Sequence, residues 1–190
     1  MTGKQQSNGI PPRNWRPMKD LRYPIGKFVM ENVLSPERRE ECIRQIADTP
    51  RILQDALSGL SPEQLDTPYR PDGWTVRQVV HHVPDSHMNA YIRFKLALTE
   101  HEPIIKPYDQ ELWAKLADTR QTPVAVSLQL LESLHERWTV LLRSLRPDDW
   151  TRTFRHPELG IVSLDANLAL YAWHGRHHVA HITSMFERIG

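Results

Sequence analysis

The 190-residue sequence has a single cysteine, no long apolar run and almost no net charge. One cysteine excludes an internal disulfide and a zinc site built on several thiolates, which favours a reducing, cytoplasmic setting. No stretch reaches the roughly 18 consecutive apolar residues of a membrane span, and the N-terminus lacks the apolar core of a secretory signal. A formal net charge of +1 gives no electrostatic footprint for nucleic acid. We therefore expect neither membrane nor nucleic-acid partners.

The sequence also lacks a glycine-rich phosphate loop and a nucleophile elbow, which excludes the common nucleotide-binding and serine-hydrolase motifs. Its length and ordinary composition fit one compact domain. Residues 1–20 are polar and proline-rich, so we expect a flexible N-terminal extension there and a single domain over residues 21–190. The segment Tyr23–Gly26 is expected to dock on this domain in extended form.

Four long segments carry the signals of amphipathic helices. Ser35-Pro36 and Thr122-Pro123 each combine a capping hydroxyl with a proline suited to the first helical turn. Pro50 lies inside the first segment and is expected to kink it. Apolar residues recur at spacings of three and four in all four segments. We predict helices over residues 35–58, 74–98, 122–145 and 163–190.

The connections between these helices differ in length. Residues 101–121 form a long link that can cross the bundle, with a short extra helix expected over 108–117. Residues 151–162 are expected to form a small hairpin closed by Pro157–Gly160. The sequence therefore predicts an all-α four-helix bundle with one crossover between its second and third helices.

The ten histidines are the most unusual feature of the composition, and seven of them fall in two predicted helices. Neutral imidazole is the commonest metal ligand in proteins, and imidazoles at positions i and i+4 point the same way from one helix. Three protein ligands with open positions are typical of a catalytic zinc site. The seven histidines are His81, His82 and His87 in the second helix, and His174, His177, His178 and His181 in the fourth.

A helical wheel selects His174 and His178 as the inward pair of the fourth helix. In the second helix it does not decide between His82 and His87. His82 is in register with Asn89 and Arg93, a polar stripe that could face a substrate. The remaining histidines are interpreted as structural or surface residues: His101, His135 and His156.

Several longer blocks resemble the YfiT-like branch of the DinB superfamily. The resemblance extends from about Tyr23 to the C-terminus, and the block on the second helix is the longest. Within that block, Pro84 replaces the alanine that is usual in the family. The blocks are Leu65–Arg70, Gly73–Glu100, Lys106–Asp109, His156–Glu158 and Tyr171–Ile182.

This resemblance implies a DinB-like bundle with an up-down-down-up course, found as a homodimer. It also implies one divalent metal per subunit, zinc or nickel. Carried over to this sequence, the metal ligands are His82, His174 and His178. The proline two residues after His82 is a departure that could reorient this ligand.

Members of the branch are described as metal-dependent hydrolases, and relatives as thiol S-transferases that use bacillithiol or mycothiol. The resemblance thus implies an enzyme that activates water or a low-molecular-weight thiol against a small-molecule substrate. Asn89 and Arg93 are the candidates for orienting an anionic substrate, and Asp85 and Glu158 are the candidate acid or base groups. The alternative hypothesis is a metal-binding, stress-related helical module without catalysis.

Overall fold

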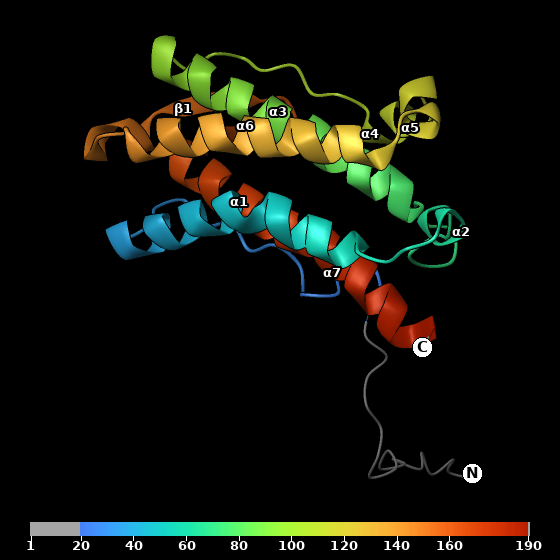
Figure 1. The fold of residues 1–190 in the computed structure, drawn as a ribbon. Helices are drawn as coiled ribbons and strands as arrows, with labels where there is room; N and C mark the ends of the chain where they lie inside the picture. The colour runs from blue at the N-terminus through green and yellow to red at the C-terminus, as the bar shows by residue number, and fades with distance from the viewer. Residues whose placement is uncertain (1–19, 190) are drawn as a thin grey trace, which may run out of the picture.

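A computed structural model describes residues 20–189, so the predicted extension lies outside the described residues except for Asp20. Four long helices dominate the fold and confirm the all-α bundle (Figure 1). Their bounds agree with the predicted segments to within two residues at every end. The four helices are α1 (Pro36–Leu57), α3 (Val76–Thr99), α6 (Val124–Arg143) and α7 (Leu164–Ile189).

The helices follow the expected up-down-down-up course. α1 and α7 run in one direction, whereas α3 and α6 run in the opposite direction (Figure 1). α1 packs against α6 and α7, and α3 packs against the same two helices. The parallel pair α3 and α6 is possible because a long link carries the chain back along the bundle.

The connections contain six short elements. The predicted hairpin is confirmed, with Thr153 paired to Ser163 and His156 to Gly160. The long link holds two short helices where the sequence predicted one, and its start pairs with the hairpin, because the Ile105 N–H donates to the Arg155 carbonyl (3.0 Å). The short elements are α2 (Pro62–Leu65), α4 (Gln110–Trp113), α5 (Ala117–Gln121), η1 (Pro147–Thr151), β1 (Thr153–His156) and β2 (Gly160–Ser163).

Local signals predicted some helix starts and missed others. Ser35 caps α1 as predicted, since its hydroxyl accepts the Arg38 N–H (3.2 Å). The predicted Thr122 cap is wrong: this residue ends α5, and Pro123 stands at the start of α6 without a side-chain cap. The extended conformation predicted around Tyr23 is also wrong, because two successive turns form there and Gly26 adopts a φ of 83°.

The apolar core consists of two clusters along the bundle axis. One includes Phe94, Trp138 and Leu168, and the other includes Leu131 and Ile182. His87 of α3, His135 of α6 and His178 of α7 are buried and fall between the residues of these two clusters in the sequence. The middle of the bundle is therefore polar, whereas the core on either side of it is apolar.

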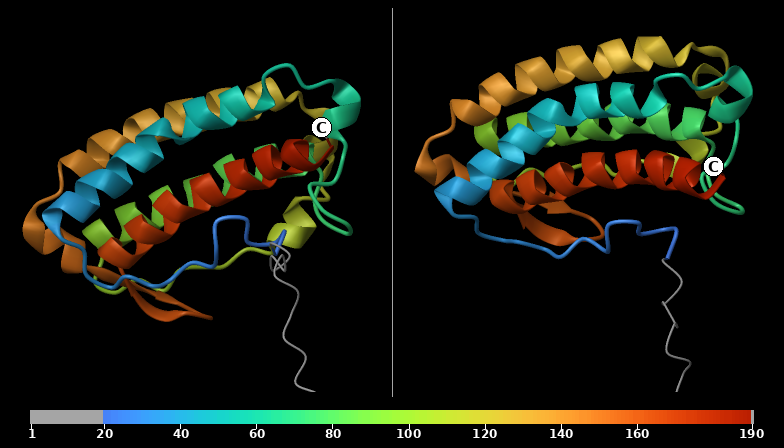
Figure 2. Two further views of the ribbon diagram at one scale, coloured as in Figure 1. Left: turned by 90° about the horizontal axis from the view of Figure 1, so that it is seen from below. Right: turned by 60° about the horizontal axis from the view of Figure 1, so that its bottom comes forward.

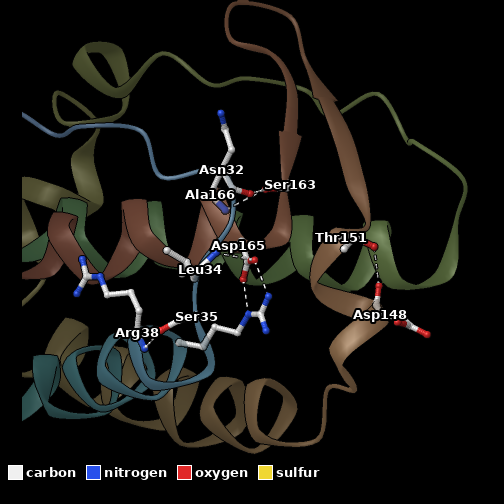
Figure 3. A network of polar contacts seen from close by, with 10 residues as sticks. Asn32, Leu34, Ser35, Arg38, Asp148, Thr151, Ser163, Asp165 and Ala166 are labelled. Carbon is white, nitrogen blue, oxygen red and sulfur yellow. Dashed lines mark hydrogen bonds and ion pairs between the residues drawn. The ribbon is translucent and has the colours of Figure 1, made fainter.

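Two contacts fix α7 against α1. Gly175 lets the helices approach closely, because a Cβ atom at this position would lie 2.7 Å from Thr49 Oγ1. At the start of α7, the buried Asp165 carboxylate accepts hydrogen bonds from Arg39 (2.7 and 2.8 Å) and from the Leu34 N–H (3.0 Å). Figure 3 shows this network and the neighbouring contact of Ser163 with the Asn32 carbonyl.

Three segments that are distant in the sequence cover the same side of the bundle. Residues 20–35 before α1 (the N-terminal segment), the link between α3 and α6, and the β1–β2 hairpin all lie over the side formed by α3 and α7 (Figure 2). This is the side that carries both histidine-rich helices. Within the described residues, no helix has the length and apolar character needed to cross a membrane.

Candidate metal centre

Three imidazoles from two helices meet in the polar middle of the bundle: His82 of α3, and His174 and His178 of α7. The His174 Nε2 atom lies 3.3 Å from His82 Nε2 and 3.2 Å from His178 Nε2. His174 and His178 are four residues apart, so one helical face presents both rings. We call these residues the three-histidine cluster.

The geometry of the three-histidine cluster fits a divalent metal. A tetrahedral zinc with bonds of 2.0–2.1 Å to nitrogen requires nitrogen atoms about 3.3 Å apart, which matches the two distances from His174 Nε2. In the chain between residues 20 and 189, this is the one group of three or more histidine, cysteine or carboxylate side chains with such spacing. The donor set is all imidazole, which suits zinc and nickel among other metals.

The cluster is electrostatically prepared for a cation. Burial lowers the pKa of His82 to about 4 and holds the pKa values of His174 and His178 well below 6.5, with the neighbouring imidazoles adding to the effect for the latter two. All three rings are therefore neutral near pH 7. Neutral imidazoles can offer lone pairs to a metal without first losing a proton.

The structure separates the two candidates that the wheel left open on α3. His82 belongs to the three-histidine cluster, whereas His87 lies behind it, with its Nε2 atom 3.1 Å from His174 Nδ1. The other nitrogen of His87 lies 2.8 Å from His135 Nε2. His135 of α6, interpreted from the sequence as structural, is indeed buried and hydrogen-bonded, but it is joined to the cluster through His87.

The other histidines of the two helices have separate environments. His81 Nδ1 lies 2.7 Å from the Ser127 hydroxyl on α6. His181 Nε2–H donates to the Arg22 carbonyl (3.1 Å), and His177 stacks on Trp173 with ring centroids 4.2 Å apart. These three residues surround the site but do not join its three-nitrogen set.

Two pockets open onto His174. The first, of about 350 Å³, lies beneath the N-terminal segment, and we call it the N-terminal pocket. The second, of about 400 Å³, lies beside the hairpin and the link, and we call it the hairpin pocket. A larger hollow of about 680 Å³ between α1 and α6 contains none of the three clustered histidines, so we place the site at the two smaller pockets. The N-terminal pocket includes Tyr23, Tyr69, Trp74, His177, His178 and His181.

The hairpin pocket contains a buried arginine. Arg93 is 8% exposed, and no carboxylate among the side chains that the structure describes forms an ion pair with it. A buried guanidinium without an acidic partner is energetically costly, so an anionic ligand would be stabilised here. Other polar residues that line the pocket are Ser86, Tyr108, His156, Glu158 and Tyr171.

His156 is a residue whose position sequence reasoning missed, because the hairpin brings it over α3. Its Nδ1 atom accepts the Glu158 N–H (3.2 Å), so the neutral ring carries its proton on Nε2. Burial, reinforced by the positive charge of Arg93, lowers the pKa of His156. A neutral ring with Nε2–H can donate a hydrogen bond to a ligand. The His156–Glu158 segment was part of the family resemblance. The sequence did not show, however, that His156 lies near Arg93 of α3.

The remaining sequence candidates lie away from the two pockets. Asn89 Nδ2 donates to the Asp85 carbonyl within its own helix (2.9 Å), and neither residue lines the N-terminal or the hairpin pocket. Burial and the nearby Asp118 raise the pKa of Asp85 to about 6. Of the four candidates for substrate or proton handling, the structure brings Arg93 and the exposed Glu158 to the hairpin pocket.

Comparison with known proteins gives this site its context. The profile of the DinB superfamily matches residues 45–182, and the chain belongs to this superfamily. A Bacillus mycoides protein named "Putative metal-dependent hydrolase" is 59% identical over 172 residues, which cover 90% of this chain and 99% of the relative. Similar proteins from Bacillus cereus and Bacillus anthracis share 58% identity and the same name.

Solved structures agree with the fold. Bacillus subtilis YfiT, described as "a probable metal-dependent hydrolase with an unusual four-helix bundle topology", superposes with a TM-score of 0.87 at 48% identity. The match covers 90% of this chain and 98% of YfiT. A mycothiol-dependent maleylpyruvate isomerase superposes with a TM-score of 0.62 over 76% of this chain and 60% of its own. Its 17% identity shows a shared fold alone.

Proposed function

We propose that the protein is a metal-dependent hydrolase of small anionic molecules, and that the three-histidine cluster holds one divalent metal, zinc or nickel. The observation that carries this proposal is the 3.2–3.3 Å spacing of Nε2 atoms from two helices, beside two pockets. A divalent metal held at these atoms would supply Lewis acidity and would lower the pKa of a water molecule bound to it to roughly 7. The names of the relatives support the same class of reaction.

The coordination set favours an enzyme over a non-catalytic metal-binding module. Structural zinc sites are closed by four protein ligands, whereas catalytic sites keep an open position. Among residues 20–189, no fourth histidine, cysteine or carboxylate completes the cluster. His87, the nearest additional imidazole, bonds His174 and His135 through its two nitrogens. The pockets that His174 and His178 line would give a substrate access to a metal held by the cluster.

Arg93 is the residue that we assign to the anionic group of the substrate. Its planar guanidinium matches the paired oxygens of a carboxylate or a phosphate. The hairpin pocket that Arg93 lines also reaches His174, so a molecule bound there would place its reacting group near the metal. His156 Nε2–H and the Tyr108 hydroxyl can donate further hydrogen bonds, since burial raises the pKa of Tyr108 to about 12 and keeps its proton in place.

Transfer of a low-molecular-weight thiol is a second candidate function, in which the thiol would have to come from a bound small molecule. The only cysteine, Cys42, is buried in α1, and burial raises the pKa of its thiol. The chain therefore offers the pockets no thiolate of its own. Thiol chemistry at this site would use a bound small thiol such as bacillithiol, and the thiolate is the reactive form.

The metal assignment is tested by paired substitutions on α3. Elemental analysis and chelator competition with zinc are run on the wild type, His82→Ala and His81→Ala. We expect His82→Ala to lose more than about 100-fold in zinc affinity, since even residues that only support a ligand account for 10–100-fold. His81→Ala should bind zinc normally, because His81 faces Ser127. Full metal content in His82→Ala would overturn the assignment.

The reaction is tested with two nitrophenyl esters that differ in one carboxylate, 4-nitrophenyl hemisuccinate and 4-nitrophenyl butyrate. We expect the zinc-loaded wild type to prefer the hemisuccinate. Arg93→Gln should lower kcat/KM for it by about 10- to 100-fold, the effect of losing a charge-assisted pair, with little change for the butyrate. Arg155→Gln is the control, because Arg155 is an exposed residue of β1. Acceleration confined to bacillithiol and chlorodinitrobenzene would overturn hydrolysis in favour of thiol transfer.

A further inference from the structure

A chain of three imidazoles runs from the three-histidine cluster to a backbone carbonyl on the opposite side of the bundle. His174 Nδ1 lies 3.1 Å from His87 Nε2, and His87 Nδ1 lies 2.8 Å from His135 Nε2. His135 Nδ1 lies 2.6 Å from the carbonyl oxygen of Ile46 on α1. We call His174, His87 and His135 the imidazole chain.

The sequence explains why the Ile46 carbonyl, at the end of the imidazole chain, is free to accept a hydrogen bond. In an α-helix the carbonyl of residue i accepts the N–H of residue i+4, which for Ile46 is residue 50. Residue 50 is proline, which has no N–H. Pro50 lies inside α1 and thus leaves the Ile46 carbonyl without its helical donor. The His135 ring on α6 supplies the missing hydrogen bond.

The carbonyl determines the direction of every hydrogen bond in the chain. A carbonyl oxygen can only accept, so His135 must carry its proton on Nδ1. With one proton on each ring, His135 Nε2 then accepts from His87 Nδ1–H, and His87 Nε2 accepts from His174 Nδ1–H. This leaves His174 Nε2 without a proton. The lone pair of that nitrogen faces the other two Nε2 atoms of the three-histidine cluster.

We propose that His87 and His135 are positioning residues that use the Ile46 carbonyl to fix the tautomer and ring orientation of His174. This inference rests on the proposed metal site. His174 is the ligand within 3.3 Å of both other Nε2 atoms, so its orientation sets the geometry of the site. The Nδ1 atom of His178, by contrast, has no hydrogen-bond partner among the described residues. Partners of this kind typically contribute 10–100-fold to metal affinity.

The first test is a long-range ¹H–¹⁵N spectrum of the metal-free wild type labelled at histidine. We expect His174, His87 and His135 each to carry the proton on Nδ1. This measurement needs neither metal nor activity, so it separates the imidazole chain from the proposed function. A proton on Nε2 of His87 or His135 would overturn the proposal. A wild type that shows the expected tautomers but binds no zinc would instead overturn the metal site.

The second test compares His135→Phe with Thr139→Val by zinc competition and by the same spectrum. Thr139 is also buried on α6, one turn away, but its hydroxyl bonds only carbonyls of its own helix. We expect His135→Phe to lose about 10–100-fold in zinc affinity and to lose the Nδ1–H signature of His174. Thr139→Val should change neither. Equal zinc affinity in the two variants would contradict the positioning role, and His87→Leu gives the same comparison should His135→Phe not fold.

Discussion

Two buried polar regions lie along α7, and they differ in how completely their atoms are paired. Asp165, at the start of the helix, has both carboxylate oxygens bonded to Arg39 and the Leu34 N–H. The three-histidine cluster begins nine residues later, about 14 Å along the helix axis. There, the Nδ1 atom of His178 has no partner in the described part of the chain. The same is true of the Nδ1 atoms of the adjacent His177 and His181.

This difference separates a polar group that holds the fold together from polar groups available to a ligand. Buried polar atoms are nearly always hydrogen-bonded in native proteins, so unpaired ones call for an explanation. The paired carboxylate joins α7 to α1, and three hydrogen bonds occupy its two oxygens. The histidines keep donor and acceptor capacity next to two pockets. Substitutions in the first region should therefore change stability, whereas substitutions in the second should change binding.

The largest expected effect is a loss of stability on substitution of Asp165, in the region whose polar atoms are all paired. Asp165→Ala leaves the guanidinium of Arg39 without its partner, and the loss of one member of a buried pair costs about 3–5 kcal/mol. Urea unfolding would measure this loss, with zinc affinity of the folded variant unchanged. Asp55→Ala is the control, because Asp55 and Arg51 form an exposed pair, and such pairs contribute only about 0.3–0.5 kcal/mol. Similar losses of stability in Asp165→Ala and Asp55→Ala would mean that the buried pair does not hold the fold together more strongly than the exposed pair.

The converse experiment removes a clustered histidine. We expect His178→Ala to lose more than about 100-fold in zinc affinity, because it deletes one of three ligands. The unfolding free energy of the metal-free protein should change by about 1 kcal/mol, the size of a typical substitution. Chelator competition and urea unfolding measure the two quantities. His177→Ala, one residue earlier, should keep its zinc affinity, and equal losses in both variants would argue against a specific three-nitrogen site.

A third substitution lies inside the His174–His178 stretch, at the point where α7 meets Thr49 of α1. Gly175→Ala places a Cβ atom 2.7 Å from Thr49 Oγ1 and 2.8 Å from its Cγ2, so α1 and α7 must move apart. Overpacking of this kind costs about 1–3 kcal/mol. Thermal or urea unfolding would show the loss. Adding Thr49→Ala removes both close atoms, and the double variant should recover stability in a mutant cycle. If the double variant does not recover stability, the contact between residue 175 and Thr49 is not the source of the strain.

The last expected effect is a pH dependence of the metal-free protein. Burial lowers the pKa values of His135 and His181 from 6.5 to about 4. Between these values the unfolded chain binds protons that the folded chain does not, so stability falls as the pH drops below about 6.5. Each such histidine contributes a slope of about 1.4 kcal/mol per pH unit. Asp85, whose pKa is raised to about 6, opposes the trend with a single group.

Urea midpoints measured with a chelator present from pH 7 to pH 5 would give this slope. The same series on Asp165→Ala should run parallel to the wild type, because the paired region lies apart from the titrating rings. A flat profile in the wild type would mean that the buried imidazoles do not remain neutral in the folded protein.

Much of the fold was predictable because its signals are local. The capping hydroxyl of Ser35 acts on the next turn of its own helix, and the apolar spacing marks each helix without reference to the others. Thr122 misled for the same reason, since the sequence does not show that α5 ends at this residue. His174 and His178 could be paired from the sequence because both lie on one helix.

The rest of the site depends on contacts between helices and loops. A wheel gives the direction of His82 and His87 around α3 but not which helix lies opposite each of them. The family resemblance, and not the wheel, selected His82. His156 meets Arg93 only because the hairpin folds over α3, 63 positions further along the chain. Pro50 marks the Ile46 carbonyl as a free acceptor, but the sequence does not show that His135 of another helix is the side chain that reaches it.

The covering of the bundle by three loop segments has a consequence for how such proteins can diversify. The nitrogens proposed to hold the metal come from helices whose packing forms the core, whereas residues such as Tyr108 and His156 come from the link and the hairpin. Loops accept insertions and replacements far more readily than packed helices do. Exchange of these two segments between members of the superfamily is therefore a direct way to graft new substrate preferences onto one unchanged reaction centre.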